Sequence, residues 1–493
     1  MAKDKSKKKP KKSKQGEASK VKERTTSKKH TKSFAGTEVA YTATAATQVF
    51  EVDDKKVSFF YVSYTQDDAD PADRPLIFCF NGGPGSSTVW LHLGVFGPRR
   101  MEFDEEGFKI GMQGELVDND HSLLDVADLV FIDAIGTGFS TTEKKEDVKE
   151  FHHFKKDIEA FSQFIVHYLN RNGRWASPKY LAGESYGTLR GAGIARELFA
   201  TYTVEFNGII LVSSILNYQT VGVDYVNYLF HPGNDLPFAL YLPAYAATSW
   251  YHERLPAKHQ SRPLREFLDE VEEFALGEYW TALAQGDRID AETKARVAAK
   301  LAEYTGISSD YIDHYDNRMQ IMRFCKELLR DQRRTVGRLD SRYTGIDRIS
   351  AGDNIEVDPA GDASGAVAAS ALNQYLREEI GFESKEIYNI MAMNVWKQWD
   401  YEDFKGSFVD TSENMREVLS RSKGTKVFVA NGYFDLATPY FATEYTFAHM
   451  GLDPEVRENV RMEYYEAGHM MYLHKPSLEA LAAHLREFVG ETS

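Results

Sequence analysis

The chain has 493 residues, 42% of them hydrophobic and 13% aromatic, which is enough for one large core with an insertion or for two or three domains. Its formal net charge of -15 argues against a general affinity for nucleic acid or anionic lipid. No apolar run approaches the roughly 20 residues of a membrane span, and two cysteines cannot form a disulfide framework. We therefore expect a globular protein without a membrane span, located in the cytoplasm. A periplasmic or secreted location is the alternative, because a large core needs no disulfides.

Residues 1–33 form a segment that is dense in Lys and Ser and nearly free of apolar residues. Such a segment cannot bury enough surface to order itself, so we predict a disordered basic tail. It also lacks the apolar central region of about 7–15 residues that a secretory signal needs. A contact of this tail with RNA or an anionic membrane is the alternative that its charge leaves open.

From residue 34 the pattern changes to strands and then to alternating strands and helices. Two β-rich stretches at 41–52 and 56–64 flank a polar turn and predict a hairpin. Short apolar runs predict strands that are buried on both faces of a parallel sheet, at 76–80, 129–133, 179–182 and 209–212. Amphipathic stretches between the later runs predict helices at 151–169 and 189–199. This is the βαβ order of a doubly wound α/β fold.

The alternation is lost between residues 221 and 384. Composition predicts mostly helix there, with helical stretches at 264–276, 291–304 and 311–329. An insertion of this kind between core strands commonly forms a lid that shapes a substrate site. The alternation returns with strands at 426–430 and 460–465 and a last helix at 477–488. We therefore assign residues 34–220 and 385–493 to one core and residues 221–384 to a helical lid.

The motif Gly183-Glu-Ser-Tyr-Gly stands between a predicted strand and a predicted helix. The pattern Gly-x-Ser-x-Gly alone is weak, because glycine is common, and a structural turn is the alternative. In this context, however, the glycines allow a sharp turn that holds Ser185 above the sheet, as in a nucleophile elbow. The sequence therefore predicts a serine hydrolase.

A serine hydroxyl needs a base to accept its proton, and the base needs an acid that orients it. Asp435 and His469 each follow a predicted strand directly, so both should lie at the carboxyl edge of the sheet together with Ser185. The nearest rivals fit less well: His474 lies toward the last helix and Asp410 precedes its strand. We expect Ser185, Asp435 and His469 to converge.

The loop Asn81-Gly-Gly-Pro-Gly follows the strand at 76–80. It should run beside the elbow and offer backbone N–H groups to the oxyanion that forms when a serine attacks a carbonyl. The alternatives are a tight turn and a phosphate cradle. No Lys follows as in a nucleotide-binding loop, so we expect neither a nucleotide nor another cofactor, and no metal.

These motifs, together with Asp133, the Gly136-Thr-Gly-Phe-Ser stretch and Asn431, resemble those of the serine carboxypeptidases in order and spacing from about residue 34 to 489. The resemblance implies the α/β-hydrolase fold, with a mostly parallel central sheet flanked by helices and a mainly helical lid insertion. It implies peptide substrates with a free C-terminus and an acyl-enzyme intermediate. The roles it implies are the nucleophile Ser185, the general base His469, the orienting acid Asp435, and an oxyanion hole formed by the N–H groups of Gly83 and Tyr186.

The resemblance also implies that Asn81, Gly82 and Glu184 recognise the substrate carboxylate. A Glu beside an anionic group must be protonated to donate a hydrogen bond, which favours binding at acidic pH. The family commonly carries a second Glu two residues before the Gly97-Pro98 pair, and this chain has Val95 there. The residues that could compensate are Arg99, Arg100 and Arg190.

Three functions follow in order from these observations. The first is a carboxypeptidase that acts on peptides. The second, suggested by Val95, is an esterase or acyltransferase that uses the same three residues. The third is a scaffold protein on an inactive hydrolase fold, which a complete set of catalytic residues disfavours.

Overall fold

The computed structural model describes residues 21–111, 114–222 and 233–493. At its centre lies a ten-stranded sheet with the order β1, β2, β3, β7, β4, β9, β10, β13, β14, and β8 pairs with β3. Strands β7 to β14 along this order are parallel, whereas β1, β2 and β3 are antiparallel. The strands are β1 (Arg24–Phe34), β2 (Thr37–Val52), β3 (Lys55–Gln66), β4 (Leu76–Phe80), β7 (Asp128–Ile132), β8 (Thr141–Thr142), β9 (Lys179–Glu184), β10 (Gly208–Val212), β13 (Lys426–Gly432) and β14 (Val460–Tyr465).

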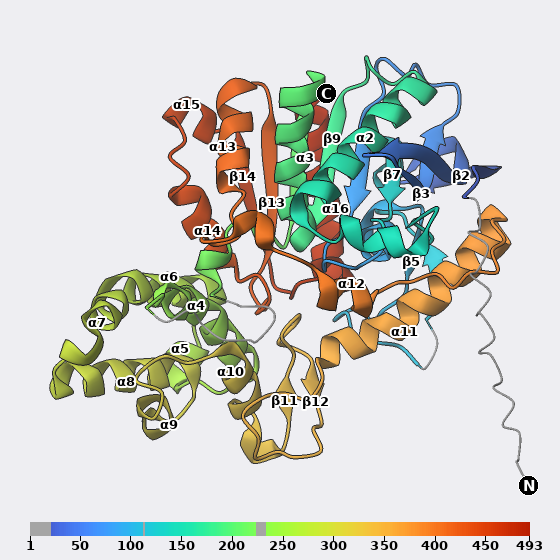
Figure 1. Ribbon diagram of the computed structural model, residues 1–493. Coiled ribbons are helices and arrows are strands. Elements are labelled where there is room, and N and C mark those ends of the chain that lie inside the picture. Colours follow the sequence, from blue (N-terminus) through green and yellow to red (C-terminus); the bar gives the residue numbers. More distant parts are fainter. Residues whose placement is uncertain (1–20, 112–113, 223–232) are drawn as a thin grey trace, which may run out of the picture.

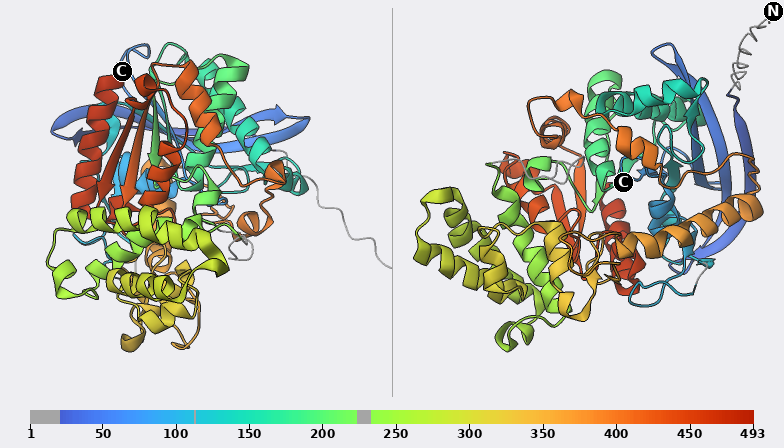
Figure 2. Two further views of the ribbon diagram at one scale, coloured as in Figure 1. Left: turned by 90° about the vertical axis from the view of Figure 1, so that its left-hand side faces the viewer. Right: turned by 60° about the horizontal axis from the view of Figure 1, so that its bottom comes forward.

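Helices cover both faces of the parallel part of the sheet (Figure 1, Figure 2). In β10, Ile209 and Leu211 belong to the core on the side of α2, α3 and α13, whereas Ile210 and Val212 belong to the core on the side of α16. Burial on both faces explains the continuous apolar runs of the strands. The predicted α/β fold class is confirmed. The helices of this core are α2 (Phe154–Asn172), α3 (Tyr186–Tyr202), α13 (Ser412–Arg421), α14 (Tyr440–Ala448), α15 (Pro454–Arg457) and α16 (Lys475–Thr492).

The prediction of a disordered tail is wrong for residues 24–33. They form most of β1, which pairs with β2 from Arg24 opposite Thr47 to Phe34 opposite Thr37. Most side chains of β1 are exposed, so the strand depends on backbone hydrogen bonds to β2 and needs no apolar run. Lysines and threonines suit such an edge, because threonine favours extended backbone and lysine discourages pairing with other chains. Residues 21–23 precede β1 without regular secondary structure, and residues 1–20 of the predicted tail lie outside the described residues.

The segment between β10 and β13 contains a helical lobe at the carboxyl ends of the parallel strands (Figure 1). After the last helix of this lobe the chain forms a two-stranded hairpin of β11 and β12. Helix α11 then runs across the molecule toward β1 and β2 (Figure 2). The elements are α4 (Leu236–Tyr251), α5 (Ala257–Gln260), α6 (Leu264–Phe274), α7 (Trp280–Gln285), α8 (Ala291–Thr305), α9 (Ser309–Asp313), α10 (Ile321–Glu327), β11 (Thr335–Val336), β12 (Thr344–Gly345) and α11 (Pro359–Gln374). The described part of the insertion is therefore mainly helical.

Residues 385–411, which the sequence assigns to the core, form a strap over the loops at the carboxyl edge. The N–H of Ala392 donates to the carbonyl of Gly85 (2.7 Å), and the N–H of Ser87 donates to the carbonyl of Ile390 (2.8 Å). The strap also contains α12 (Met393–Gln398). A short sheet of β5 (Arg99–Met101) and β6 (Leu116–Asp118) completes the loops of this edge.

Two observations bear on the surroundings of the protein. Cys79 and Cys325 are unpaired and buried, as expected of small apolar side chains in a core. Among the helices of the described residues, none has the length and hydropathy needed to cross a bilayer. The cytoplasmic location stays a prediction.

Asp128, the first residue of β7, is a buried carboxylate that joins three segments. It accepts hydrogen bonds from Arg74 Nε (3.2 Å), from an Arg174 guanidinium nitrogen (2.5 Å) and from the N–H of Gln66 (2.9 Å). Its side chain and that of Arg174 are 2% and 4% exposed, so water cannot replace the lost partner in a truncated variant.

We predict that Asp128→Ala lowers the free energy of unfolding by about 3–5 kcal/mol, the usual effect of leaving a buried charge unpaired. Urea denaturation followed by circular dichroism measures the change. The matched control is Glu413→Ala, because Glu413 is 70% exposed in its pair with Arg416 and exposed pairs contribute little. Equal stability of the two variants would contradict this account of Asp128.

Candidate active site

Ser185 occupies a sharp turn between β9 and α3. Its backbone has φ 58° and ψ -129°, a strained conformation for a residue with a side chain. Hydrogen bonds maintain this strain: the N–H of Ser185 donates to the carbonyl of Val212 (3.0 Å), and its carbonyl accepts from the N–H and hydroxyl of Thr188 (both 2.8 Å). A Cβ on Gly183 would lie 2.2 Å from the carbonyl oxygen of Gly187. Glycine at 183 is therefore required for the turn that presents the hydroxyl.

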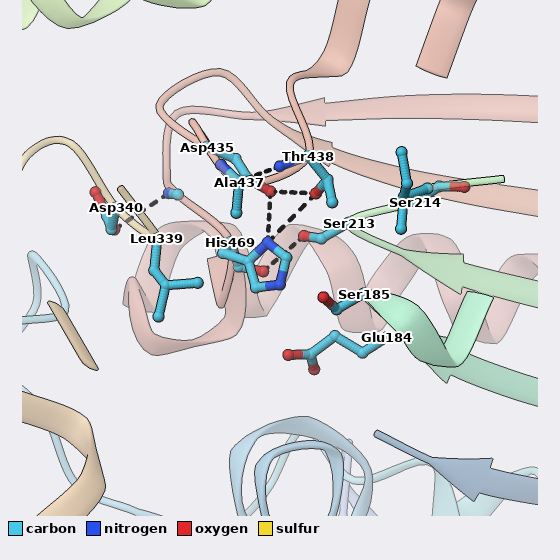
Figure 3. A network of polar contacts seen from close by, with 12 residues as sticks. Glu184, Ser185, Ser213, Ser214, Leu339, Asp340, Asp435, Ala437, Thr438 and His469 are labelled. Carbon is cyan, nitrogen blue, oxygen red and sulfur yellow. Dashed lines mark hydrogen bonds and ion pairs between the residues drawn. The ribbon is translucent and has the colours of Figure 1, made fainter. Parts of the chain in front are cut away.

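Asp435 and His469 form a buried hydrogen-bonded pair, with 2.7 Å between Asp435 Oδ2 and His469 Nδ1 (Figure 3). The same carboxylate accepts from the N–H groups of Ala437 (2.7 Å) and Thr438 (3.0 Å) and from the hydroxyl of Thr438 (2.7 Å). Asp435 is fully buried, and these donors supply the partners that a buried charge requires. Thr438 was not singled out from the sequence, although its place three residues after Asp435 fits a local capping bond.

The imidazole of His469 is held with Nε2 toward Ser185. Figure 3 shows the Ser185 side chain beside the ring edge opposite Nδ1. Burial alone would lower the pKa of His469, but the carboxylate of Asp435 stabilises the imidazolium and raises this pKa above its ordinary value. The hydroxyl of Ser213 donates to the carbonyl of His469 (2.6 Å) and fixes the backbone of the loop. The three residues predicted to be catalytic thus lie together.

The insertion holds the two loops that carry Asp435 and His469. The carbonyl of Leu339 accepts from the N–H of His469 (2.6 Å), and the carbonyl of Arg338 accepts from the N–H of Leu436 (3.0 Å). Asp340 accepts from the N–H of Gly468 (3.2 Å) (Figure 3). No motif marks these residues, because carbonyl oxygens carry no sequence signal and the contacts span more than 90 residues of chain.

The predicted oxyanion loop lies directly against the start of α3. A Cβ on Gly82 would be 2.5 Å from the backbone nitrogen of Tyr186 and 2.6 Å from that of Gly187. Gly83 has φ 106°, which favours glycine. The N–H of Tyr186 is the first of α3, so no carbonyl of the same helix can accept from it. The loop that contains Gly83 therefore meets the start of α3 at Gly82, next to Ser185.

Arg190 supports this loop from the side of the core and is not available to a substrate. It is fully buried, donates to the carbonyl of Asn81, and pairs with Asp157 (2.7 Å). The suggestion that Arg190 reads a substrate carboxylate is therefore wrong. The other two candidates are also engaged elsewhere: Arg99 pairs with Asp118 and Glu379, and Arg100 donates to the carbonyl of Met101.

Glu184 is a buried carboxyl group next to Ser185. Burial raises its pKa to about 7, although the charge of His469 and hydrogen bonds from Tyr472 and Asn81 act in the opposite direction. The phenol of Tyr472 donates to Glu184 Oε2 (2.7 Å). Asn81 also accepts the N–H of Leu91 on its side-chain oxygen (3.1 Å). Asn81, Gly82 and Glu184 thus lie together as expected, and Tyr472 is an addition that the sequence did not indicate.

The rival residues serve other purposes. His474 bonds to the hydroxyl of Ser477 (2.7 Å) at the start of α16, and Asp410 accepts from the side chain of Asn217 (3.0 Å).

The ligand atoms of His259, Glu270 and Glu303 lie within 4.8 Å of one another. The two carboxylates of this cluster are already paired with positive side chains that a metal ion would have to displace, namely Lys258, Arg262 and Lys300.

Comparison with known proteins gives a consistent family. The family model described as serine carboxypeptidase matches residues 41–482. The pheromone-processing carboxypeptidase KEX1 of Saccharomyces cerevisiae is 33% identical over 144 residues, which are 28% of this chain and 18% of that protein. Serine carboxypeptidase-like 8 of Arabidopsis thaliana is 28% identical over 152 residues, which are 30% of this chain and 33% of that protein. The matched parts thus span at most about a third of these relatives.

Solved structures with similar chains include hydrolases of several kinds. Proline iminopeptidase of Mycobacterium smegmatis has a TM-score of 0.37 and 14% identity, covering 90% of this chain and 98% of its own. A soluble variant of monoglyceride lipase from Saccharomyces cerevisiae has a TM-score of 0.38 and 11% identity, covering 90% and 95%. Similarities of this size carry no inference about function.

We predict that Gly82→Ala slows the labelling of Ser185 by a fluorophosphonate probe by about a hundredfold. The new Cβ must push the loop away from α3, and a displacement of about 1 Å in a catalytic constellation has an effect of that order. The matched control is Gly191→Ala in α3, whose Cβ would meet only the Phe80 ring at 3.8 Å. Equal labelling rates of both variants would show that the loop does not need this close approach.

Proposed function

The chain belongs to the serine carboxypeptidase family, and we propose that it releases residues from the C-terminus of peptides through an acyl-enzyme intermediate. The observation that carries the proposal is the arrangement around Ser185: the hydrogen-bonded pair of Asp435 and His469 on one side and the buried Glu184 on the other. The first group of residues suits attack on a carbonyl carbon. The second suits recognition of the substrate's free end.

In the proposed reaction, Ser185 Oγ forms a bond to the carbonyl carbon of the last peptide bond while its proton passes to His469 Nε2. The carbonyl electrons move to oxygen, and the N–H groups of Gly83 and Tyr186 stabilise the resulting oxyanion. The intermediate then collapses, the C–N bond breaks, and the leaving amine takes the proton from His469. Water, deprotonated by His469, next attacks the acyl carbon. The bond from this carbon to Ser185 Oγ then breaks, Oγ takes the proton back from His469, and the shortened peptide leaves with a new carboxylate.

Asp435 stabilises the imidazolium during both steps. It keeps Nδ1 protonated, so that Nε2 faces Ser185 as the acceptor. The three hydrogen bonds that Asp435 accepts from Ala437 and Thr438 maintain its position without neutralising it. Because both residues are buried, the attraction between them is weakly screened by solvent.

Glu184 recognises the terminal carboxylate in its protonated form. A carboxyl group with a pKa of about 7 is mostly protonated in acidic solution, and it can then donate a hydrogen bond to an anionic oxygen. Asn81, which contacts Glu184, and Gly82 contribute further polar groups beside it. An ionised Glu184 would repel the substrate instead.

An esterase or acyltransferase remains the second candidate, because Val95 is a buried apolar residue where the resemblance implies a second acid. Cleavage of a blocked amino acid ester without any peptide cleavage between about pH 4 and 8 would select it.

Two measurements test the proposed activity. We expect that Ser185→Ala abolishes labelling by a fluorophosphonate probe and removes peptide hydrolysis, because no other group can form the acyl bond. We also expect the unchanged protein to cleave N-blocked dipeptides with a free C-terminus at least tenfold faster than their C-terminal amides. Equal rates on acid and amide would contradict carboxylate recognition. Absence of labelling in folded protein would contradict the proposal that the chain is an enzyme.

The pH dependence tests the role of Glu184. Below about pH 7 Glu184 is protonated, so we expect KM for the free-acid dipeptide to be low there and to rise as the pH passes 7. The amide needs no donor at this place, so its KM should stay constant. In Glu184→Gln the amide side chain donates at every pH, and the rise above pH 7 should disappear. If KM for the free acid still rises above pH 7 in this variant, the rise comes from the titration of another group.

A further inference from the structure

Tyr472 is a buried tyrosine whose hydroxyl reaches the carboxyl group beside the nucleophile. It lies in a short 3₁₀ helix, Met471–Leu473, three residues after His469. Its side chain is almost fully buried, and its hydroxyl donates to Glu184 Oε2 (2.7 Å). The loop that carries His469 therefore also contacts the proposed carboxylate site.

The ring of Tyr472 packs on the residue before Val95, the position where the resemblance implies a second acid. A Cβ on Gly94 would lie 2.3 Å from ring atom Cε2 of Tyr472, so the ring packs directly on the backbone of Gly94. The next residue, Val95, is fully buried in the same core cluster as Tyr472. The partner of Glu184 is thus supplied by the His469 loop and not by the segment that contains Val95.

We propose that Tyr472 is a specificity-determining residue that directs the proton of Glu184 toward the terminal carboxylate of a peptide substrate. The inference rests on the proposed function. A protonated carboxyl group accepts on its carbonyl oxygen and donates from its hydroxyl oxygen. In the proposed arrangement the phenol donates to Oε2 and the proton of Glu184 is carried by Oε1. Oε1 is then the donor that remains for the substrate.

A phenol differs from a second carboxyl group in that it does not ionise in the working range. Burial raises the pKa of Tyr472 well above its ordinary value, so Tyr472 is a donor at every pH of interest. Glu184 is then the single titrating member of the pair. The other groups that face Glu184 are His469 and Asp435, through their charges, and Asn81, through a hydrogen bond.

The test is Tyr472→Phe, which removes one oxygen atom and keeps the ring on Gly94. We expect the ratio of kcat/KM for the free-acid dipeptide to that for its amide to fall about tenfold at pH 6, the usual effect of one hydrogen bond. We also expect the pH at which KM for the acid rises to move upward by about one unit, because the ionised Glu184 loses a donor. Labelling of Ser185 by the fluorophosphonate probe should change by less than about twofold.

The matched control is Tyr465→Phe, at the end of β14, whose buried hydroxyl bonds to His484 Nδ1 (3.0 Å). It should leave the acid-to-amide ratio and the pH profile unchanged. A second check places Tyr472→Phe in the Glu184→Gln background, where the added effect on the ratio should be less than about twofold because the proton to be directed is absent.

Two results would overturn the inference. One is an unchanged ratio and pH profile in Tyr472→Phe. The other is an equal loss on acid and amide without a pH shift, which would mean that Tyr472 only supports the fold. Failure of the proposed function has a different signature, because the unchanged protein would then show no preference for the free acid.

Discussion

The close approach of two backbone segments, the loop after β4 and the first turn of α3, is the constraint on which the site depends. The segments meet at Gly82, where a side chain would overlap the backbone nitrogens of Tyr186 and Gly187. The strained backbone of Ser185 is stabilised at the same place, between β10 and α3. Arg190 binds the carbonyl of Asn81 and so fixes the loop from the side of the core. In the proposed reaction, backbone donors and nucleophile are thus aligned before any substrate arrives, which is the condition for electrostatic stabilisation of a transition state.

Three ionisable groups around Ser185 are buried, and each avoids the desolvation penalty in its own way. Asp435 accepts hydrogen bonds from several donors that surround it. The imidazolium form of His469 loses hydration on burial, but the carboxylate of Asp435 stabilises it and raises its pKa. Glu184 has no cationic partner as close, so burial favours its neutral form. Two carboxyl groups near one serine thus lie in different surroundings.

Much of this arrangement could be predicted from the sequence, and physical reasons explain why the rest could not. Ser185, Asp435 and His469 could be placed because each follows a strand of the parallel sheet, and the carboxyl ends of parallel strands share one edge. Strand β1 could not be predicted from the sequence, because its pairing depends on backbone groups that every polar segment also carries. Tyr472 could not either, because an aromatic residue near a catalytic loop is most often core. The contacts of Leu339 and Asp340 join segments far apart in the chain, and a carbonyl oxygen leaves no trace in composition.

The bonds from residues 338–340 to the loops of Asp435 and His469 make the insertion a structural support of the candidate site. A helix of the outer lobe can change its sequence, or even its length, without moving the imidazole, provided that this short stretch stays in register. On the proposed function, we expect new substrate preferences to arise in the outer helices, whereas excision of the whole insertion would remove the bond that holds the loop of His469. Substrate choice and the position of the imidazole would then depend on different parts of one segment of chain.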